Sequence, residues 1–203
     1  MSKKRFAVLG LAALATSAVI GVAGAGTASA CSVGAPSTAY AASLPQVLQG
    51  QSGPEVMGLQ LELRKLGYPL TGTGYYGTNT LAAVQDFQRK HGIKDSGIVG
   101  SKTWGALVGV LGQGVTHNGA NIQGLPQIVP GQATGDDFAK LNWVMSRIEP
   151  YAMSFGEGYY GPVAQAAVRD FQSRMGINPS GIVGPKTWAA LQRVISIEGG
   201  WSC

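Results

Sequence analysis

The sequence is short of the side chains that most enzymes use for chemistry. Its 203 residues include two histidines and two cysteines, and only 12% are charged. His91 and His117 stand apart from any cysteine or acid pair, so a zinc peptidase site is not expected. Neither Cys31 nor Cys203 has the local context of a catalytic thiol, and no motif that pairs a serine nucleophile with a Lys or His base appears. We therefore expect no catalytic residue, no metal site and no cofactor.

Paired carboxylates, which glycan cleavage requires, are also missing. Glu157, between Phe155 and Tyr159, is the one acid in a setting that resembles a catalytic loop. No second carboxylate accompanies it, and the matching position earlier in the chain is Thr73. We interpret Glu157 as a solvated loop residue.

Long apolar runs are confined to the beginning of the chain. Lys3, Lys4 and Arg5 precede an Ala/Gly/Val/Leu run that closes with small residues at 28–30, which is typical of a secretory signal peptide. Without this leader the 15 basic residues fall to 12, against 10 acidic ones. The remaining chain has no concentrated basic surface for nucleic acid and no later run that could span a membrane. A secreted protein, extracellular or associated with the cell wall, is predicted.

The two cysteines would stand at the two ends of the mature chain. In an oxidising compartment this even count favours a disulfide between Cys31 and Cys203, which would lower the entropy of the unfolded chain. A second interpretation is that Cys31 is lipidated, because Ala-Ser-Ala-Cys resembles a bacterial lipobox. Ala28, however, stands where such boxes usually have a large aliphatic residue.

Most of the remaining sequence is an internal repeat. Residues 74–107 align with 158–191 without a gap, and 22 of the 34 positions are identical. The similarity continues upstream, where Leu44-Pro45-Gln46-Val47 answers to Leu125-Pro126-Gln127-Ile128. Between the copies lies a polar, Gly-rich linker with a flexible reach of roughly 20 Å, so the two units could tilt against each other.

Each copy is predicted to form three short helices. The first begins at a capping pattern, Ser52-Gly-Pro-Glu55 in one copy and Thr134-Gly-Asp-Asp137 in the other. The second begins at Thr78 or Pro162, just after the GYYG motif, and the third at Ser101 or Pro185. Apolar residues spaced three and four apart give each helix one buried stripe. The fold class is therefore all-α, with two tandem three-helix bundles.

These motifs resemble the peptidoglycan-binding domain family of three-helix modules. The resemblance lies in Leu59-Gln60 of the first helix, in Gly-Tyr-Tyr-Gly followed by Ala-Val-x-x-Phe-Gln, and in the closing Gly-Ile-Val-Gly-x-x-Thr-Trp-x-x-Leu. The second copy departs from it in its first helix, where Asn142 replaces the Gln, and Ser96 and Ser180 stand where the family usually has Asp. The resemblance implies small helical bundles that hold bacterial cell wall.

The predicted organisation follows from the repeat and the resemblance. It comprises a signal peptide (1–30), an N-terminal extension (31–43), module 1 (44–111), a linker (112–124), module 2 (125–195) and a C-terminal tail (196–203).

A wall binder needs exposed aromatic and hydrogen-bonding side chains in a shallow groove. The first Tyr of each GYYG motif is expected to face outward and the second to pack in the core, while the tryptophans could serve either role. The predicted ligand-binding residues are Tyr75, Gln88, Arg89, Trp104, Tyr159, Gln172 and Trp188.

The function predicted from sequence is that of a secreted, non-catalytic protein that binds peptidoglycan as a monomer through two modules. Two alternatives stay open. One is a cell-wall hydrolase, or a subunit that positions a separate hydrolase. The other is a structural or inhibitory protein that uses this fold to bind a protein partner.

Overall fold

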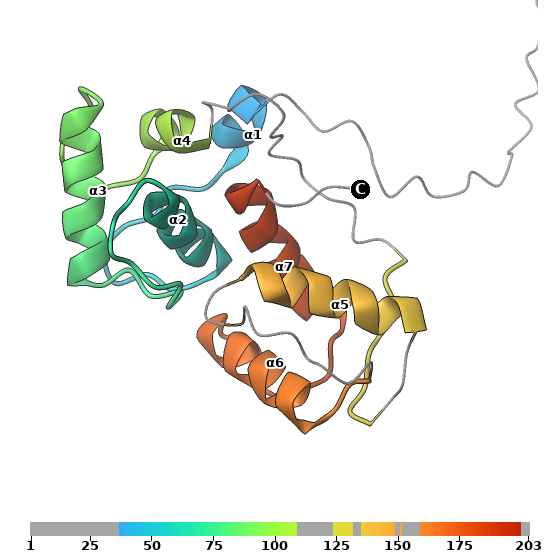
Figure 1. Ribbon diagram of the computed structural model, residues 1–203. Coiled ribbons are helices and arrows are strands. Elements are labelled where there is room, and N and C mark those ends of the chain that lie inside the picture. The colour runs from blue at the N-terminus through green and yellow to red at the C-terminus, as the bar shows by residue number, and fades with distance from the viewer. Residues whose placement is uncertain (1–36, 109–123, 132–134, 149–150, 152–158, 200–203) are drawn as a thin grey trace, which may run out of the picture.

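The computed structural model describes residues 37–108, 124–131, 135–148, 151 and 159–199. The leader, Cys31, Cys203, His117, Glu157 and the predicted cap at Thr134 lie outside the described residues, so the disulfide and the lipid anchor stay predictions. Seven helices and no extended sheet strand are found in the described part of the chain, which confirms the all-α fold class. Figure 1 shows these helices gathered in two groups.

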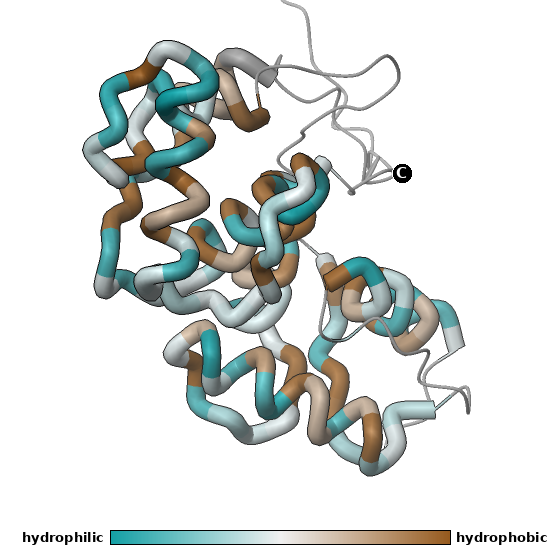
Figure 2. Tube along the Cα trace, turned by 60° about the vertical axis from the view of Figure 1, so that its left-hand side comes forward, coloured by the Kyte–Doolittle hydropathy of each residue, from teal (hydrophilic) through white to brown (hydrophobic). Residues whose placement is uncertain are grey.

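The first bundle consists of α2 (Pro54–Lys65), α3 (Thr78–Lys90) and α4 (Ser101–Val108). The second consists of α5 (Gly135–Arg147), α6 (Pro162–Arg174) and α7 (Pro185–Glu198). Apolar and polar residues alternate along the helices, as the colours of Figure 2 show. In both bundles the helices enclose an aromatic core that contains the second Tyr of GYYG, the Phe of the second helix and the Trp of the third.

The capping box predicted at Ser52 is wrong. The residue that caps α2 is Gly53, with φ at 144°, and no side chain caps the helix. Ser52 instead forms an antiparallel bridge with Tyr75. Ser52 therefore pairs with the loop that carries GYYG and does not cap α2.

The segment before each bundle is tied to the turn before its third helix. Val47 and Val99 exchange backbone hydrogen bonds of 3.1 and 2.8 Å, and Ile128 and Val183 exchange bonds of 3.0 and 2.9 Å. The weak Leu-Pro-Gln similarity between the copies thus marks a structural element, which closes each bundle at one end.

Two helical features extend beyond the predicted modules. An additional helix, α1 (Ser37–Ser43), lies in the predicted extension and packs against α4. Helix α7 continues through Glu198, past the module boundary predicted after residue 195, because Ile197 extends its buried apolar stripe.

The two bundles are joined through α2 and α7, which lie side by side (Figure 1). Ile197 of α7 belongs to the core of the first bundle, while Met57 and Leu61 of α2 belong to the core of the second. The Gly-rich linker led us to expect that the two units could tilt against each other. Instead, the shared apolar contact holds them together.

Candidate functional site

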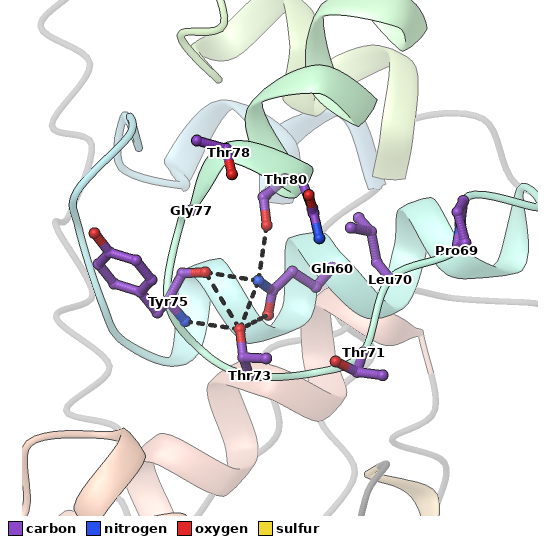
Figure 3. Close-up of a pocket in the computed structure, with 10 residues that line it drawn as sticks. Gln60, Pro69, Leu70, Thr71, Thr73, Tyr75, Gly77, Thr78 and Thr80 are labelled. Atoms are coloured by element: carbon purple, nitrogen blue, oxygen red, sulfur yellow. Dashed lines mark hydrogen bonds between the residues drawn. The ribbon is translucent and has the colours of Figure 1, made fainter.

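A hollow on the first bundle is the strongest candidate for a ligand site. It lies between α2, the 69–77 loop and the start of α3, and its volume is about 230 Å³ (Figure 3). The residues that line it are Gln60, Pro69, Leu70, Thr71, Thr73, Tyr75, Gly77, Thr78, Asn79 and Thr80.

Gln60 holds the wall of this hollow in place. Its side-chain Nε2 donates to the Tyr75 carbonyl at 2.9 Å and to Thr80 Oγ1 at 2.9 Å, and its Oε1 accepts from the Gly74 amide at 2.9 Å. Thr73 Oγ1 lies 3.0 Å from the same Nε2 (Figure 3). Because Gln60 is 2% exposed and bonded at both ends of its amide, it positions the loop and offers no free group to a ligand.

The side chains at the rim of the hollow are exposed and polar. Tyr75 is 54% exposed, and Thr71, Thr78 and Asn79 are exposed as well. Within the described residues, no hydrogen bond engages the hydroxyls of Thr71, Thr78 and Tyr75 or the amide of Asn79. The hollow therefore presents one aromatic ring and four hydrogen-bonding groups to solvent.

A second hollow of about 450 Å³ adjoins the first one and shares Pro69, Leu70 and Asn79 with it. On its far side Tyr68 donates a hydrogen bond to Asp86 Oδ2 at 2.9 Å, and Lys90 Nζ lies 2.7 Å from the same oxygen. The hydrogen bonds from Lys90 and Tyr68 lower the pKa of Asp86, so this carboxylate is ionised and paired at neutral pH.

The predicted ligand role of Gln88 and Gln172 is wrong. Both side chains are fully buried. Gln88 donates to the Ile98 carbonyl at 2.9 Å and to Thr103 Oγ1 at 3.0 Å, and it accepts from the Gly97 amide at 2.9 Å. Gln172 makes the same three kinds of bond at its matching position. In each bundle the side-chain amide of this glutamine is therefore fully hydrogen-bonded to the turn and the start of the third helix.

Trp104 and Trp188 are likewise core residues, and their predicted ligand role is wrong. They are 0% and 1% exposed. Each indole Nε1 donates to a carbonyl of the preceding segment, at 2.8 Å to Pro45 in the first bundle and at 2.9 Å to Pro126 in the second. A tryptophan that closes its own bundle leaves neither ring face nor N–H for a ligand.

The second Tyr of GYYG is buried, as expected. Tyr76 donates from its hydroxyl to the Gly97 carbonyl at 2.6 Å, and Tyr160 donates to the Gly181 carbonyl. Burial raises the pKa of both phenols. Gly97 has φ at 74°, and a Cβ there would lie 2.2 Å from Leu81, so this turn requires glycine.

The remaining predicted residues lie at the surface. Arg89 is exposed and reaches Asp95 at 3.3 Å and Asp86 at 3.6 Å. Tyr159 is 38% exposed, and its ring lies over Gly161, where a Cβ would come within 2.8 Å of it. Their ligand contacts stay predictions.

Among the described residues, the second bundle lacks several of the polar side chains that line this hollow. Thr78, Asn79 and Thr80 are replaced by Pro162, Val163 and Ala164, and Asn142 stands in place of Gln60. Val163 is 69% exposed, so at this position an apolar side chain takes the place of the polar Asn79. Aligning the two copies position by position reveals this chemical difference in the sequence itself.

The described residues contain neither a metal-binding cluster nor a membrane-spanning helix. Over the described ranges, no group of three or more His, Cys, Asp or Glu side chains could hold a metal ion. Each helix in those ranges is too short or too polar to cross a membrane.

Comparison with known proteins gives two matches to one family model. Residues 52–107 and 150–191 match the putative peptidoglycan binding domain. The second match begins after α5, the helix whose sequence departs most from the pattern.

Several relatives carry names from cell-wall degradation. A probable N-acetylmuramoyl-L-alanine amidase of Bacillus licheniformis is 31% identical over 153 residues, which cover 70% of this chain and 43% of the amidase. A spore cortex-lytic enzyme of Bacillus cereus is 34% identical over 138 residues, covering 61% and 53%. An uncharacterised protein of Kitasatospora aureofaciens is 45% identical over 78 residues, covering 37% and 66%. The chain thus spans less than half the length of the amidase.

Proposed function

Two segments of the chain belong to the peptidoglycan-binding domain family, and on this premise we propose that the protein is a secreted, non-catalytic binder of bacterial cell wall. The observation that carries the proposal is the hollow of the first bundle, with the exposed ring of Tyr75 and four unengaged hydrogen-bonding groups around it. Cell-wall polymer offers hydroxyls, amides and flat apolar faces, which such a groove complements.

The first bundle is proposed as the principal binding unit. Its loop is fixed by Gln60, so little conformational entropy is lost when a ligand binds. The second bundle presents Tyr159 and Val163, which could add a weaker contact. A second contact on the same polymer raises apparent affinity through effective concentration.

Retention on purified insoluble peptidoglycan tests the proposal. The full chain should sediment with the wall, and Tyr75→Ala should weaken binding about two- to twelvefold, since an aromatic contact contributes about 0.5–1.5 kcal/mol. Leu66→Ala is the matched control, because Leu66 is 56% exposed and lies outside the hollow. A chain that stays in the supernatant would contradict the proposal.

A second candidate function is the targeting of a cell-wall hydrolase. The names of the relatives favour it, since two of them are wall-lytic enzymes that the chain matches over only about half their length. Turbidity of a wall suspension separates the two functions. Clearing by the purified chain alone would show hydrolysis, whereas faster clearing only when a separate wall hydrolase is added would show targeting.

A further inference from the structure

The lining of the hollow contains no acidic or basic side chain. Its ten residues contribute threonine hydroxyls, two amides, one phenol and the apolar groups of Pro69 and Leu70. An ionised ligand group placed here would lose water without gaining an opposite charge, so its binding is disfavoured. The chemistry of the hollow is therefore suited to an uncharged ligand with many hydrogen-bonding groups.

The adjoining hollow extends the same preference. It shares one wall with the first, so a ligand longer than one unit can occupy both. Asp86, the acid that lines this second hollow, is already paired with Lys90 at 2.7 Å. A ligand carboxylate here would face Asp86 and would have to compete with it for that lysine.

Cell-wall polymer contains two parts of different charge. The N-acetylated sugar units carry hydroxyl and acetamido groups, whereas the stem peptides carry free carboxylates and amines. We propose that the two adjoining hollows of the first bundle bind uncharged N-acetylhexosamine units of the glycan strand and do not recognise the stem peptide. The inference rests on the proposed function and specifies its ligand.

Tyr75 and Asn79 have distinct roles in this arrangement. The exposed ring of Tyr75 offers a flat face on which a sugar ring stacks. Asn79 lines both hollows and is exposed, so its amide can pair with sugar hydroxyl or acetamido groups where successive units meet. Its counterpart Val163 cannot form such bonds, so we assign this amide contact with the glycan to the first bundle.

A competition experiment tests the proposal with the full chain bound to insoluble peptidoglycan. The competitors are a tetramer of β-1,4-linked N-acetylglucosamine and a free stem tetrapeptide, both at millimolar concentration. We expect the sugar tetramer to release the chain and the peptide to leave it bound. Release by the peptide, or by neither competitor, would overturn the proposal. Retention without competitor is measured first, so a failure of wall binding itself is recognised separately.

A pair of variants tests whether Asn79 contacts the sugar. Asn79→Val, which introduces the residue of the second copy, should raise the concentration of sugar tetramer needed for half release at least threefold. Asn178→Val is the matched control, because Asn178 is an exposed asparagine of the second bundle outside both hollows. If both variants need the same concentration of sugar tetramer for half release and keep their melting temperatures, Asn79 and the wall shared by the two hollows do not contact the sugar.

Discussion

At the scale of single residues, Glu62 is a buried carboxyl beside the contact between α2 and α7. It lies on α2 and is 8% exposed. Lys65 Nζ lies 3.0 Å from its Oε1 and 2.7 Å from Oε1 of Glu198 on α7. Arg147 Nε approaches the other oxygen of Glu198 at 3.9 Å. Burial raises the pKa of Glu62 to about 7, against the opposing effect of Lys65.

This raised pKa predicts a pH dependence of stability. A carboxyl whose pKa is higher in the folded than in the unfolded state contributes stability that is fully present below about 4.5 and is lost as pH rises through about 7. The free energy of unfolding should therefore fall over this range, by at most about 3 kcal/mol from Glu62. Glu62→Gln should flatten the profile, as measured by urea unfolding at pH 5 and pH 8. An unchanged slope in the variant would show that other groups cause the dependence.

At the scale of elements, α1 shows how a weak helix is held by its neighbour. With seven residues, Ser37–Ser43 is too short to be stable alone. It packs against α4, and Ala41 is 1% exposed while the adjacent Ala42 is exposed. The first bundle thus relies on a segment that precedes its family pattern.

Two neighbouring substitutions test the packing of α1. Ala41→Asp would bury a carboxylate without a partner and should lower the free energy of unfolding by on the order of 3 kcal/mol. Ala42→Asp, one residue along the same helix, should change it by less than about 0.5 kcal/mol. The midpoint of urea unfolding distinguishes them. Equal midpoints would show that α1 does not pack as described.

At the scale of the whole molecule, the contact between α2 and α7 decides how the two copies are arranged. Gly58 permits this close approach, since a Cβ at this position would lie 2.8 Å from Cβ of Ile197. Ion pairs flank the contact, with Lys65 reaching Glu198 at 2.7 Å and Arg193 reaching Glu55 at 3.3 Å. Helix α2 thus carries Gln60, which fixes the candidate site, and also holds the second bundle.

Gly58→Ala should loosen this arrangement. In a helix interior, alanine in place of glycine normally stabilises by about 0.5–1 kcal/mol. At Gly58 the clash with Ile197 should reverse the sign and cost about 1–3 kcal/mol. Gly105→Ala on α4 is the matched control, because no atom lies within 4 Å of its added Cβ and normal stabilisation is expected.

Thermal unfolding measures both glycine variants, and small-angle scattering reports whether the bundles separate. Adding Ile197→Ala to Gly58→Ala should recover part of the lost stability by making room for the new methyl group. A stabilised Gly58→Ala variant would contradict the α2–α7 contact.

Local information was enough to determine the helical class and most helix starts. Proline or threonine at the first turn of a helix, glycine at its end and a single apolar stripe act within a few residues, so they are legible in the sequence. The family match also follows from such local motifs. Helix α1 was missed because its stability comes from α4 and not from its own seven residues.

Whether a polar or aromatic side chain is buried or available to a ligand depended on the tertiary structure. Gln88 and Gln60 are both glutamines in repeated motifs, and composition cannot show that one closes a turn and the other anchors a loop. From the sequence, Trp104 was a candidate to stack on a ligand, but its indole N–H donates a hydrogen bond to a carbonyl 59 residues away in the chain. The sequence by itself determined two copies of a helical bundle from the peptidoglycan-binding domain family. Only long-range packing decided which surface is left for a ligand and that the copies share a core, because both depend on contacts between residues far apart in the chain.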